Sequence, residues 1–319
     1  MRGSFDLIVV GHQTIDEIVL PGQPVRRSPG GSVTFASLAA TRIGRSTAVV
    51  SRVGRDFPEK YIQELIHQGI NLDGVIRDRL LDTTRFEIRY QEGAERRHLR
   101  LAKRCSEILP EDIPLDATAK AVHLGPVAGE ISLETARQAR KISELLSIDL
   151  QGCIRDFGPR GEVTLTRSLD QKLIDLVDII KVSEDELTLA SSFNNMSAAR
   201  EELHLSRDKV LIVTRGKAGS KILRGDEVVE MPAYPVGKVR DPTGAGDAFI
   251  GVFVTELTHG SSLDESAAMG SAAASFLVEG FGLGYFVSKK EVYERASALL
   301  KQIKGRMTQR SNLLGTNAS

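Results

Sequence analysis

Short runs of β-branched and aliphatic residues alternate with segments of helical periodicity, and this alternation limits the possible folds more than any other feature. FDLIVVG (5–11) predicts a buried first strand, SVTFASLAATRI (32–43) a helix, and STAVVSRVG (46–54) a second strand. The same rhythm predicts further helices over 58–68 and 132–146 and further strands over 119–125, 147–150, 176–182 and 209–216. Such alternation predicts an α/β fold, with a mostly parallel central sheet and helices on both faces.

Two segments interrupt this rhythm with the alternating pattern of exposed strands. The first begins with TIDEIVL at residue 14, and the second covers 83–102 and contains a hairpin-like EGAE at 92–95. Because such strands do not fit the interior of a parallel sheet, we expect a small β-sheet lid inserted at about 14–28 and 83–102. The main domain is expected over 1–303, followed by a polar, disordered tail at 304–319.

The charge balance gives no global electrostatic argument for a nucleic-acid or membrane partner. The 319 residues include 42 Lys and Arg against 42 Asp and Glu, so the formal net charge is zero. The apolar run near the N-terminus is too short for a membrane span, and Asp6 interrupts it. Cys105 and Cys153 are the only cysteines and lie far apart in the sequence, which indicates free thiols in a reducing cytoplasm.

The run VRDPTGAGDAFI (239–250) places a carboxylate inside a glycine-rich turn at a predicted helix start. The small residues at 244–246 allow a tight backbone path whose N–H groups converge at the positive end of the helix dipole. Asp247 would lie beside any anion bound there, which suits a general base in phosphoryl transfer. The alternative is an N-cap that stabilises the helix by about 1 kcal/mol and has no chemical role.

Three motifs give the chain its resemblance to a known family. DPTGAGD (241–247) is similar to D-T-x-G-A-G-D, the C-terminal signature of the ribokinase-like (PfkB) carbohydrate kinases, with Pro242 as the only departure. The segment 29–57 resembles the N-terminal signature, in which a glycine pair opens a helix that leads to a strand and G-x-D. VTRGKAGS (213–220) resembles the T-x-G-x-x-G turn. The resemblance spans nearly the whole chain and implies an ATP-dependent phosphotransferase with an alcohol group as acceptor.

The resemblance implies roles for the residues of the C-terminal signature. Asp247 corresponds to the catalytic base, and the anion hole for the transferred phosphoryl group corresponds to the amides of Gly244, Ala245 and Gly246. Asp241 stands where related enzymes hold a monovalent cation such as K⁺ or orient the substrate. Pro242 removes no carboxylate, so its effect is expected on the backbone beside that cation rather than on catalysis.

The nucleotide side of the site is implied by the turn at 213–220. Thr214, Gly216 and Gly219 match the residues that bind ATP in the family. The alternative is a plain hairpin turn between two strands, because glycines serve both purposes.

KVSEDEL (181–187) corresponds to the family's N-x-x-E motif beside the donor phosphates. Ser183 replaces the asparagine, and Glu186 keeps the acid that holds the water shell of Mg²⁺. A Ser-x-x-Glu capping box at a helix start is the structural alternative, and both interpretations can hold together.

The acceptor side is implied by residues near the N-terminus. Asp16 matches the family aspartate that bonds substrate hydroxyls from the edge of the lid. Gly30 and Gly31 match the pair that lets the backbone approach the substrate and acts as the lid hinge. Phe35 stands where many sugar kinases have an asparagine on the sugar, which argues against a ribokinase-like furanose pocket.

The segment DLQGCIRDF (149–157) resembles the inositol-kinase-like branch of the family. Gln151 and Arg155 are therefore expected at the substrate, and the favoured acceptor is myo-inositol or a similar cyclic polyol. The alternative for Arg155 is a solvated surface arginine.

Two other functions and one structural question stay open at this point. A nucleoside kinase would need base-stacking aromatic residues from the lid, where Phe86 and Tyr90 are available. A catalytically silent binding or regulatory homologue would be expected to lack the base or the anion hole, and both are intact. The alternating apolar residues of the lid are compatible with a monomer or with a lid-mediated homodimer.

Overall fold

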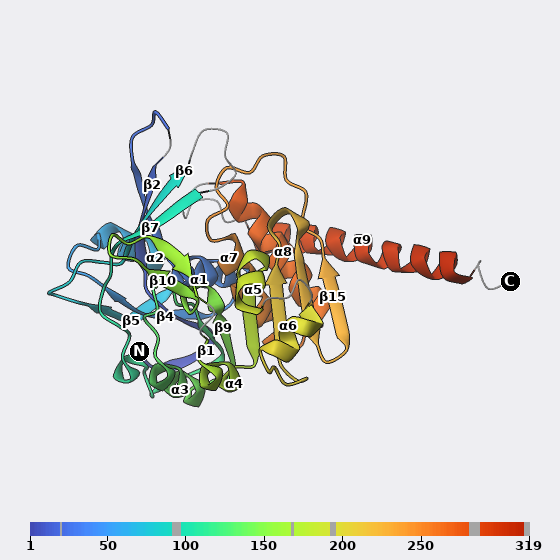
Figure 1. Ribbon diagram of the computed structural model, residues 1–319, viewed down its shortest axis with the longest axis horizontal. Coiled ribbons are helices and arrows are strands. Elements are labelled where there is room, and N and C mark those ends of the chain that lie inside the picture. The colour runs from blue at the N-terminus through green and yellow to red at the C-terminus, as the bar shows by residue number, and fades with distance from the viewer. Residues whose placement is uncertain (20, 91–96, 167–168, 192–195, 281–287, 316–319) are drawn as a thin grey trace.

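The computed structural model describes residues 1–19, 21–90, 97–166, 169–191, 196–280 and 288–315 (Figure 1). Within these ranges a nine-stranded sheet has the order β15-β14-β13-β12-β9-β8-β1-β4-β5. Its neighbours pair in parallel from β5 to β13, and β14 and β15 add antiparallel strands at one edge. The strands are β1 (Gly3–Val10), β4 (Thr47–Val53), β5 (Asn71–Arg77), β8 (Ala117–Leu124), β9 (Ser143–Asp149), β12 (Ile179–Ser183), β13 (Val210–Thr214), β14 (Ser220–Arg224) and β15 (Glu227–Met231). The predicted α/β fold is confirmed.

Helices cover both faces of the sheet, and the strand side chains alternate between two cores. Leu7 and Val9 of β1 lie in one apolar cluster, whereas Ile8 and Val10 lie in the other. The first cluster includes residues of α1 (Ser32–Arg42), α2 (Glu59–His67), α7 (Ala245–Thr258), α8 (Leu263–Val278) and α9 (Lys289–Gly315). The second includes residues of α3 (Leu133–Lys141), α4 (Gln171–Leu176), α5 (Glu184–Ser191) and α6 (Met196–Glu202).

A separate four-stranded sheet in the order β3-β2-β6-β7 rises beside the carboxyl ends of the parallel strands (Figure 1). It consists of β2 (Thr14–Val19), β3 (Arg26–Gly30), β6 (Arg85–Tyr90) and β7 (Arg97–Lys103). Both segments that were predicted to form a lid therefore join one sheet, and EGAE at 92–95 falls outside the described residues. Phe86 and Ile88 of β6 are buried with Val127 and Ala128 of the body. Ile15 of β2 points to the opposite face of the sheet and is buried with Val53, Phe57 and Tyr61.

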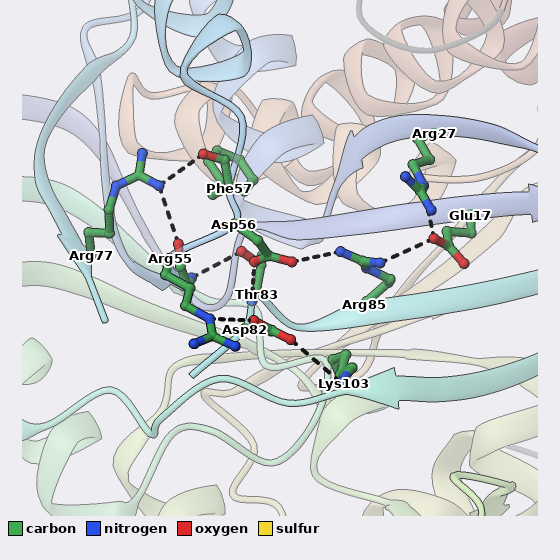
Figure 2. A network of polar contacts seen from close by, with 11 residues as sticks. Glu17, Arg27, Arg55, Asp56, Phe57, Arg77, Asp82, Thr83, Arg85 and Lys103 are labelled. Carbon is green, nitrogen blue, oxygen red and sulfur yellow. Dashed lines mark hydrogen bonds and ion pairs between the residues drawn. The ribbon is translucent and has the colours of Figure 1, made fainter. Parts of the chain in front are cut away.

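A network of charged side chains joins this lid to the body (Figure 2). Asp56, at the end of the G-x-D motif, accepts hydrogen bonds from the Thr83 amide at 2.7 Å and from the Arg85 guanidinium at 2.7 Å. Arg85 also lies 3.3 Å from Glu17 on β2, and Glu17 accepts a second bond from Arg27 on β3 at 2.9 Å. The strands β2, β3 and β6 are thus tied to one loop of the body.

Two helices differ from the sequence prediction. Helix α3 ends at Lys141 instead of reaching 146, because the residues from Ser143 onward pair with β8 and β12 as strand β9. The tertiary pairing outweighs the local helical pattern. Helix α9 continues to Gly315, so the predicted irregular tail is helical from 304 to that residue, and Figure 1 shows this end of α9 extending away from the body.

Two sequence expectations concern the pairing of the cysteines and the presence of membrane-spanning helices. Cys105 and Cys153 are both unpaired, as predicted. Across the described ranges no helix combines the length and the apolar character that a membrane crossing requires.

Candidate active site

A cavity of about 80 Å³ lies between the lid and the carboxyl ends of the parallel strands. In open α/β sheets this edge is where ligands bind. Four of the residues predicted from the sequence bring their polar side chains to this cavity, together with apolar side chains from the lid and from α1. The lining residues are Thr14, Asp16, Gly31, Ser32, Phe35, Phe86, Ile88, Leu99, Val127, Gln151, Arg155, Thr243, Gly244 and Asp247.

The signature turn before α7 requires glycine at its first position. Gly244 caps α7 with φ 79° and ψ −2°, a left-handed conformation that glycine adopts without steric cost. A Cβ at this position would also lie 2.3 Å from Cγ of Phe35, so the aromatic ring packs directly against the turn. The phenylalanine that replaces the family asparagine therefore supports the turn and also lines the cavity.

A second glycine in the turn makes room for a lysine. A Cβ at Gly246 would lie 2.8 Å from Nζ of Lys181, so the ammonium group of this β12 residue sits against the first turn of α7. The Ala245 N–H donates to the carbonyl of Pro242 at 3.3 Å. Within the described ranges the Gly246 N–H meets no backbone acceptor, which leaves it available for an anion.

The glycine pair at the start of α1 is explained by the position of Asp16. A Cβ at Gly30 would lie 2.1 Å from Oδ2 of Asp16, and Gly31 has φ 86° and lies against the carbonyl of His12. The Asp16 carboxylate on β2 accepts a hydrogen bond from Thr14 at 2.7 Å and faces the cavity. Asp241 lies near it, because both line a small hollow of about 10 Å³ beside Phe35.

The opposite wall of the cavity follows the short helix Leu150–Gly152 and strand β10 (Arg155–Phe157). Arg155 donates to the carbonyl of Val127 at 3.2 Å and to Oε1 of Gln151 at 3.2 Å, so it is not a solvated surface arginine. Its guanidinium also lies 5.8 Å from the ring centre of Phe86 in the lid. Gln151 in turn points Nε2 toward Oδ1 of Asp247 at 3.4 Å.

A buried ion pair lies beneath the signature turn. Lys181 and Asp149 face each other on the neighbouring parallel strands β12 and β9, and their side chains meet at 2.5 Å. The Asp149 side chain is fully buried and that of Lys181 is 7 % exposed. Burial alone would lower the pKa of Lys181, but the negative charges of Asp149, Asp247 and Glu186 outweigh burial and raise it.

The environment of Asp247 tunes its pKa toward neutrality. Burial raises the pKa of Asp247 from 3.8 to about 6, and the negative charge of Asp149 adds to this rise. Lys181 is the strongest opposing influence, followed by the Ser32 hydroxyl and Arg155. A carboxylate whose pKa lies just below neutral pH is ionised under working conditions and still accepts a proton readily, as a general base must.

The predicted nucleotide turn forms a tight hairpin between β13 and β14. Gly219 has φ 90°, and a Cβ there would lie 2.1 Å from the carbonyl of Met231. The Gly219 N–H donates to Gly216, which has φ 52°, and the Gly219 carbonyl accepts from Arg215. The hairpin alone accounts for both glycines, while Thr214 ends β13 at the same edge of the sheet as the cavity.

Ser183 and Glu186 form the reciprocal contacts of a capping box at the start of α5. The Ser183 N–H donates to Oε2 of Glu186 at 2.9 Å, and the Glu186 N–H donates to the Ser183 hydroxyl at 3.3 Å. The described residues contain no group of three or more His, Cys, Asp or Glu side chains that could hold a metal by themselves. Any ion here would depend on water and on ligands from the donor.

Sequence reasoning missed Lys181, Asp149 and Ser32 as parts of this site. Each lay inside a segment that carries a family motif, but none occupies one of the motif positions to which a role was assigned. A signal did exist: a lysine between Ile180 and Val182 in a buried strand has to find an anionic partner, because an unpaired buried charge is very costly. The partner could not be identified from the sequence, since it comes from another strand.

Two curated kinases with different acceptors in their names are similar to this chain. The cytidine kinase of Thermococcus kodakarensis is 27 % identical over 285 residues, which cover 87 % of this chain and 97 % of that protein. The inositol 3-kinase of Arabidopsis thaliana is 29 % identical over 285 residues, which cover 86 % of this chain and 74 % of that protein.

Solved structures share the fold. The ribokinase of Arabidopsis thaliana, solved with ribose and ATP, superposes with a TM-score of 0.74 at 21 % identity, covering 92 % of this chain and 99 % of that one. A pyrophosphate-dependent myo-inositol kinase gives a TM-score of 0.74 at 20 % identity, covering 92 % of this chain and 98 % of that one. In that kinase, replacing an asparagine and a serine by leucine converts a 1-kinase into a 3-kinase.

The fold and the comparisons define a phosphotransferase whose acceptor is an alcohol group. The family profile described as pfkB family carbohydrate kinase matches residues 4–290, and the chain belongs to this family. The predicted resemblance is therefore confirmed. Its relatives phosphorylate inositols as well as nucleosides, so membership alone leaves the acceptor undetermined.

Proposed function

We propose that the chain transfers the γ-phosphoryl group of ATP to a hydroxyl of a cyclic polyol of the myo-inositol type. One observation carries the proposal: Asp247, Gln151, Arg155 and Asp16 converge on one cavity. Its other lining residues combine three hydroxyl side chains with apolar ones, among them Phe35, Phe86, Ile88, Leu99 and Val127. Asp247 takes the proton of the attacking hydroxyl, and the amides of the 244–246 turn bind the transferred phosphoryl oxygens. The Ala245 N–H exchanges its 3.3 Å bond to the Pro242 carbonyl for the phosphoryl oxygen when the phosphoryl group binds. The other polar side chains hold the neighbouring hydroxyls of the ring, which fixes the attacking oxygen in place.

The ATP would lie on the side of the hairpin at Thr214, Gly216 and Gly219. Glu186 fits an Mg²⁺ ion held mainly through water, because one carboxylate oxygen caps α5 and few other protein ligands are at hand. When bound, Mg²⁺ neutralises charge on the donor phosphates. We place a monovalent cation such as K⁺ at Asp241, whose Oδ1 already accepts the Thr243 N–H at 2.9 Å.

The proposal includes the position that is phosphorylated. Ile88 and Leu99 face each other on β6 and β7, and both line the cavity. They are as many residues apart as the two positions whose replacement by leucine converts the solved inositol kinase to 3-phosphorylation. We take Ile88 and Leu99 as the counterparts of those two positions, and because both are apolar in this chain we propose the 3-hydroxyl as the acceptor. Ile88→Asn/Leu99→Ser is expected to raise the share of 1-phosphate, measured by chiral chromatography because the two products are enantiomers.

A nucleoside kinase is the second candidate, and the similarity to cytidine kinase favours it. Phe86 or Tyr90 would have to stack on the base, and the Arg155 guanidinium already lies over the ring of Phe86. A coupled assay of ADP release across inositols, pentoses, hexoses and nucleosides decides between the two, with pyrophosphate as an alternative donor. Asp247→Asn is the matched control. Strong turnover of a nucleoside with none of any polyol would overturn the proposed acceptor.

A further inference from the structure

The buried pair Lys181–Asp149 is placed where a fixed charge can act on the catalytic turn. Lys181 and Asp149 lie opposite each other in register on β12 and β9, near the ends of both strands. Asp149 is further held because its Oδ1 accepts the Gln151 N–H at 3.0 Å. The ammonium group of Lys181 is therefore held by a fixed ion pair with Asp149. Moving it away from the turn would leave the buried Asp149 carboxylate without its partner, which is costly.

The same ammonium group also lies against the first turn of α7, at Gly246. The space that a side chain of Gly246 would fill is taken by Lys181, whose Nζ lies 2.8 Å from the position of a Cβ. Gly246 is an ordinary helical residue without positive φ, so its backbone conformation does not require glycine, and a side chain there would meet the lysine. An ion pair that served only to hold β9 against β12 would not need to reach α7.

Charged and polar groups face Asp247 from every element that surrounds it. Lys181 on β12 and Arg155 on β10 favour its ionised form, and so does the Ser32 hydroxyl of α1. Asp149 on β9 disfavours it. Gln151 and Asp16 on β2 lie at the same cavity as Asp247, and His123 on β8 and Glu186 on α5 lie near Lys181. Of the cations, Lys181 is the one nearly excluded from solvent, so its charge is screened least.

We propose that Lys181 is a positioning residue that keeps Asp247 ionised as a base, and that Asp149 holds Lys181 in place and moderates its effect. The proposal rests on the role of Asp247 given under the proposed function. It predicts opposite consequences for the two halves of one ion pair. Loss of the lysine makes Asp247 harder to ionise, whereas loss of the Asp149 charge makes it easier.

The test compares kcat/KM for myo-inositol against pH, at saturating MgATP, in the wild type and three variants. Lys181→Met is expected to move the acid limb up by about one pH unit, which lowers activity at pH 6 by about five-fold and leaves alkaline activity nearly unchanged. Asp149→Asn is expected to move the limb down. The double variant Lys181→Met/Asp149→Asn is expected between the wild type and Lys181→Met, because the lysine outweighs the aspartate at Asp247.

The double variant also guards against misfolding, since it leaves no unpaired buried charge. A purely structural pair would lower activity by the same factor at every pH, and coincident acid limbs in all four proteins would overturn the proposal. A second readout is independent of any substrate: titration of the Asp247 carboxyl by NMR with carbon-13 aspartate, assigned by its loss in Asp247→Asn. If no polyol is phosphorylated, the proposed function fails, while the order of the NMR titrations still supports or refutes the role of Lys181.

Discussion

Asp247→Asn is expected to lower the catalytic activity and to raise the stability of the fold at pH 8. The wild-type carboxyl has a pKa of about 6 in the folded chain against 3.8 in the unfolded chain. Folding therefore favours the protonated form, and between these two pH values the unfolded chain gives up its proton first. Stability consequently falls as pH rises from about 4 to about 6 and stays lower above that range. Asparagine cannot ionise, so the variant escapes this loss.

The size of the effect follows from the shift in pKa. A rise of about two units corresponds to at most about 3 kcal/mol, and partial exposure of Asp247 to the cavity reduces it to about 1–2 kcal/mol. The variant should thus be more stable than the wild type at pH 8, with a melting temperature higher by about 2–6 °C. Its turnover should fall by about 10²–10⁴ while its affinity for ATP stays within a few-fold of wild type.

Urea denaturation of both proteins at pH 8 and pH 5, beside a coupled ADP assay, measures both consequences. The gain in stability should shrink at pH 5, where much of the wild-type carboxyl is already protonated. A variant that is inactive and also less stable at pH 8 would refute the assigned environment of Asp247. Near-wild-type turnover would refute its role as the base.

Two further substitutions test the turn and the lid. Gly244→Ala should destabilise the chain by about 2 kcal/mol or more and lower kcat, because φ 79° strains alanine and its Cβ meets Phe35; urea denaturation with and without Phe35→Leu separates the two causes. Asp56→Asn should loosen the lid by weakening its contact with Arg85, and raise KM for the acceptor more than KM for ATP in steady-state kinetics. Equal changes in KM for the acceptor and KM for ATP would show that the substitution does not act through the lid.

The sequence predicts those parts of the fold that depend on local pattern. The alternation of apolar strands with helices is sufficient to predict the parallel sheet. The alternating pattern at 14–28 and 83–102 is sufficient to predict the lid. The overlong helix at 132–146 shows the limit, because Ser143–Asp149 becomes a strand only through its two neighbours in the sheet. A segment of this length cannot carry information on partners that lie elsewhere in the chain.

The same distinction holds within the site. The residues around Asp247 could be placed because a glycine-rich turn, a helix start and a family motif coincide in one short run. The pairing of Lys181 with Asp149 could not be predicted, since it joins residues of two strands between which β10, β11 and α4 lie in the sequence. Phe35 was recognised as a departure from the family pattern, but its contact with Gly244 depends on the packing of α1 against α7.

The central claim is that Asp247 activates a polyol hydroxyl for phosphorylation. It is tested most directly by incubating wild type and Asp247→Asn with MgATP and myo-inositol, and following the phosphate by phosphorus-31 NMR. We expect an inositol monophosphate from the wild type and, over the same period, none from the variant even though it still binds ATP. Formation of the same product at the same rate by both proteins would contradict the claim.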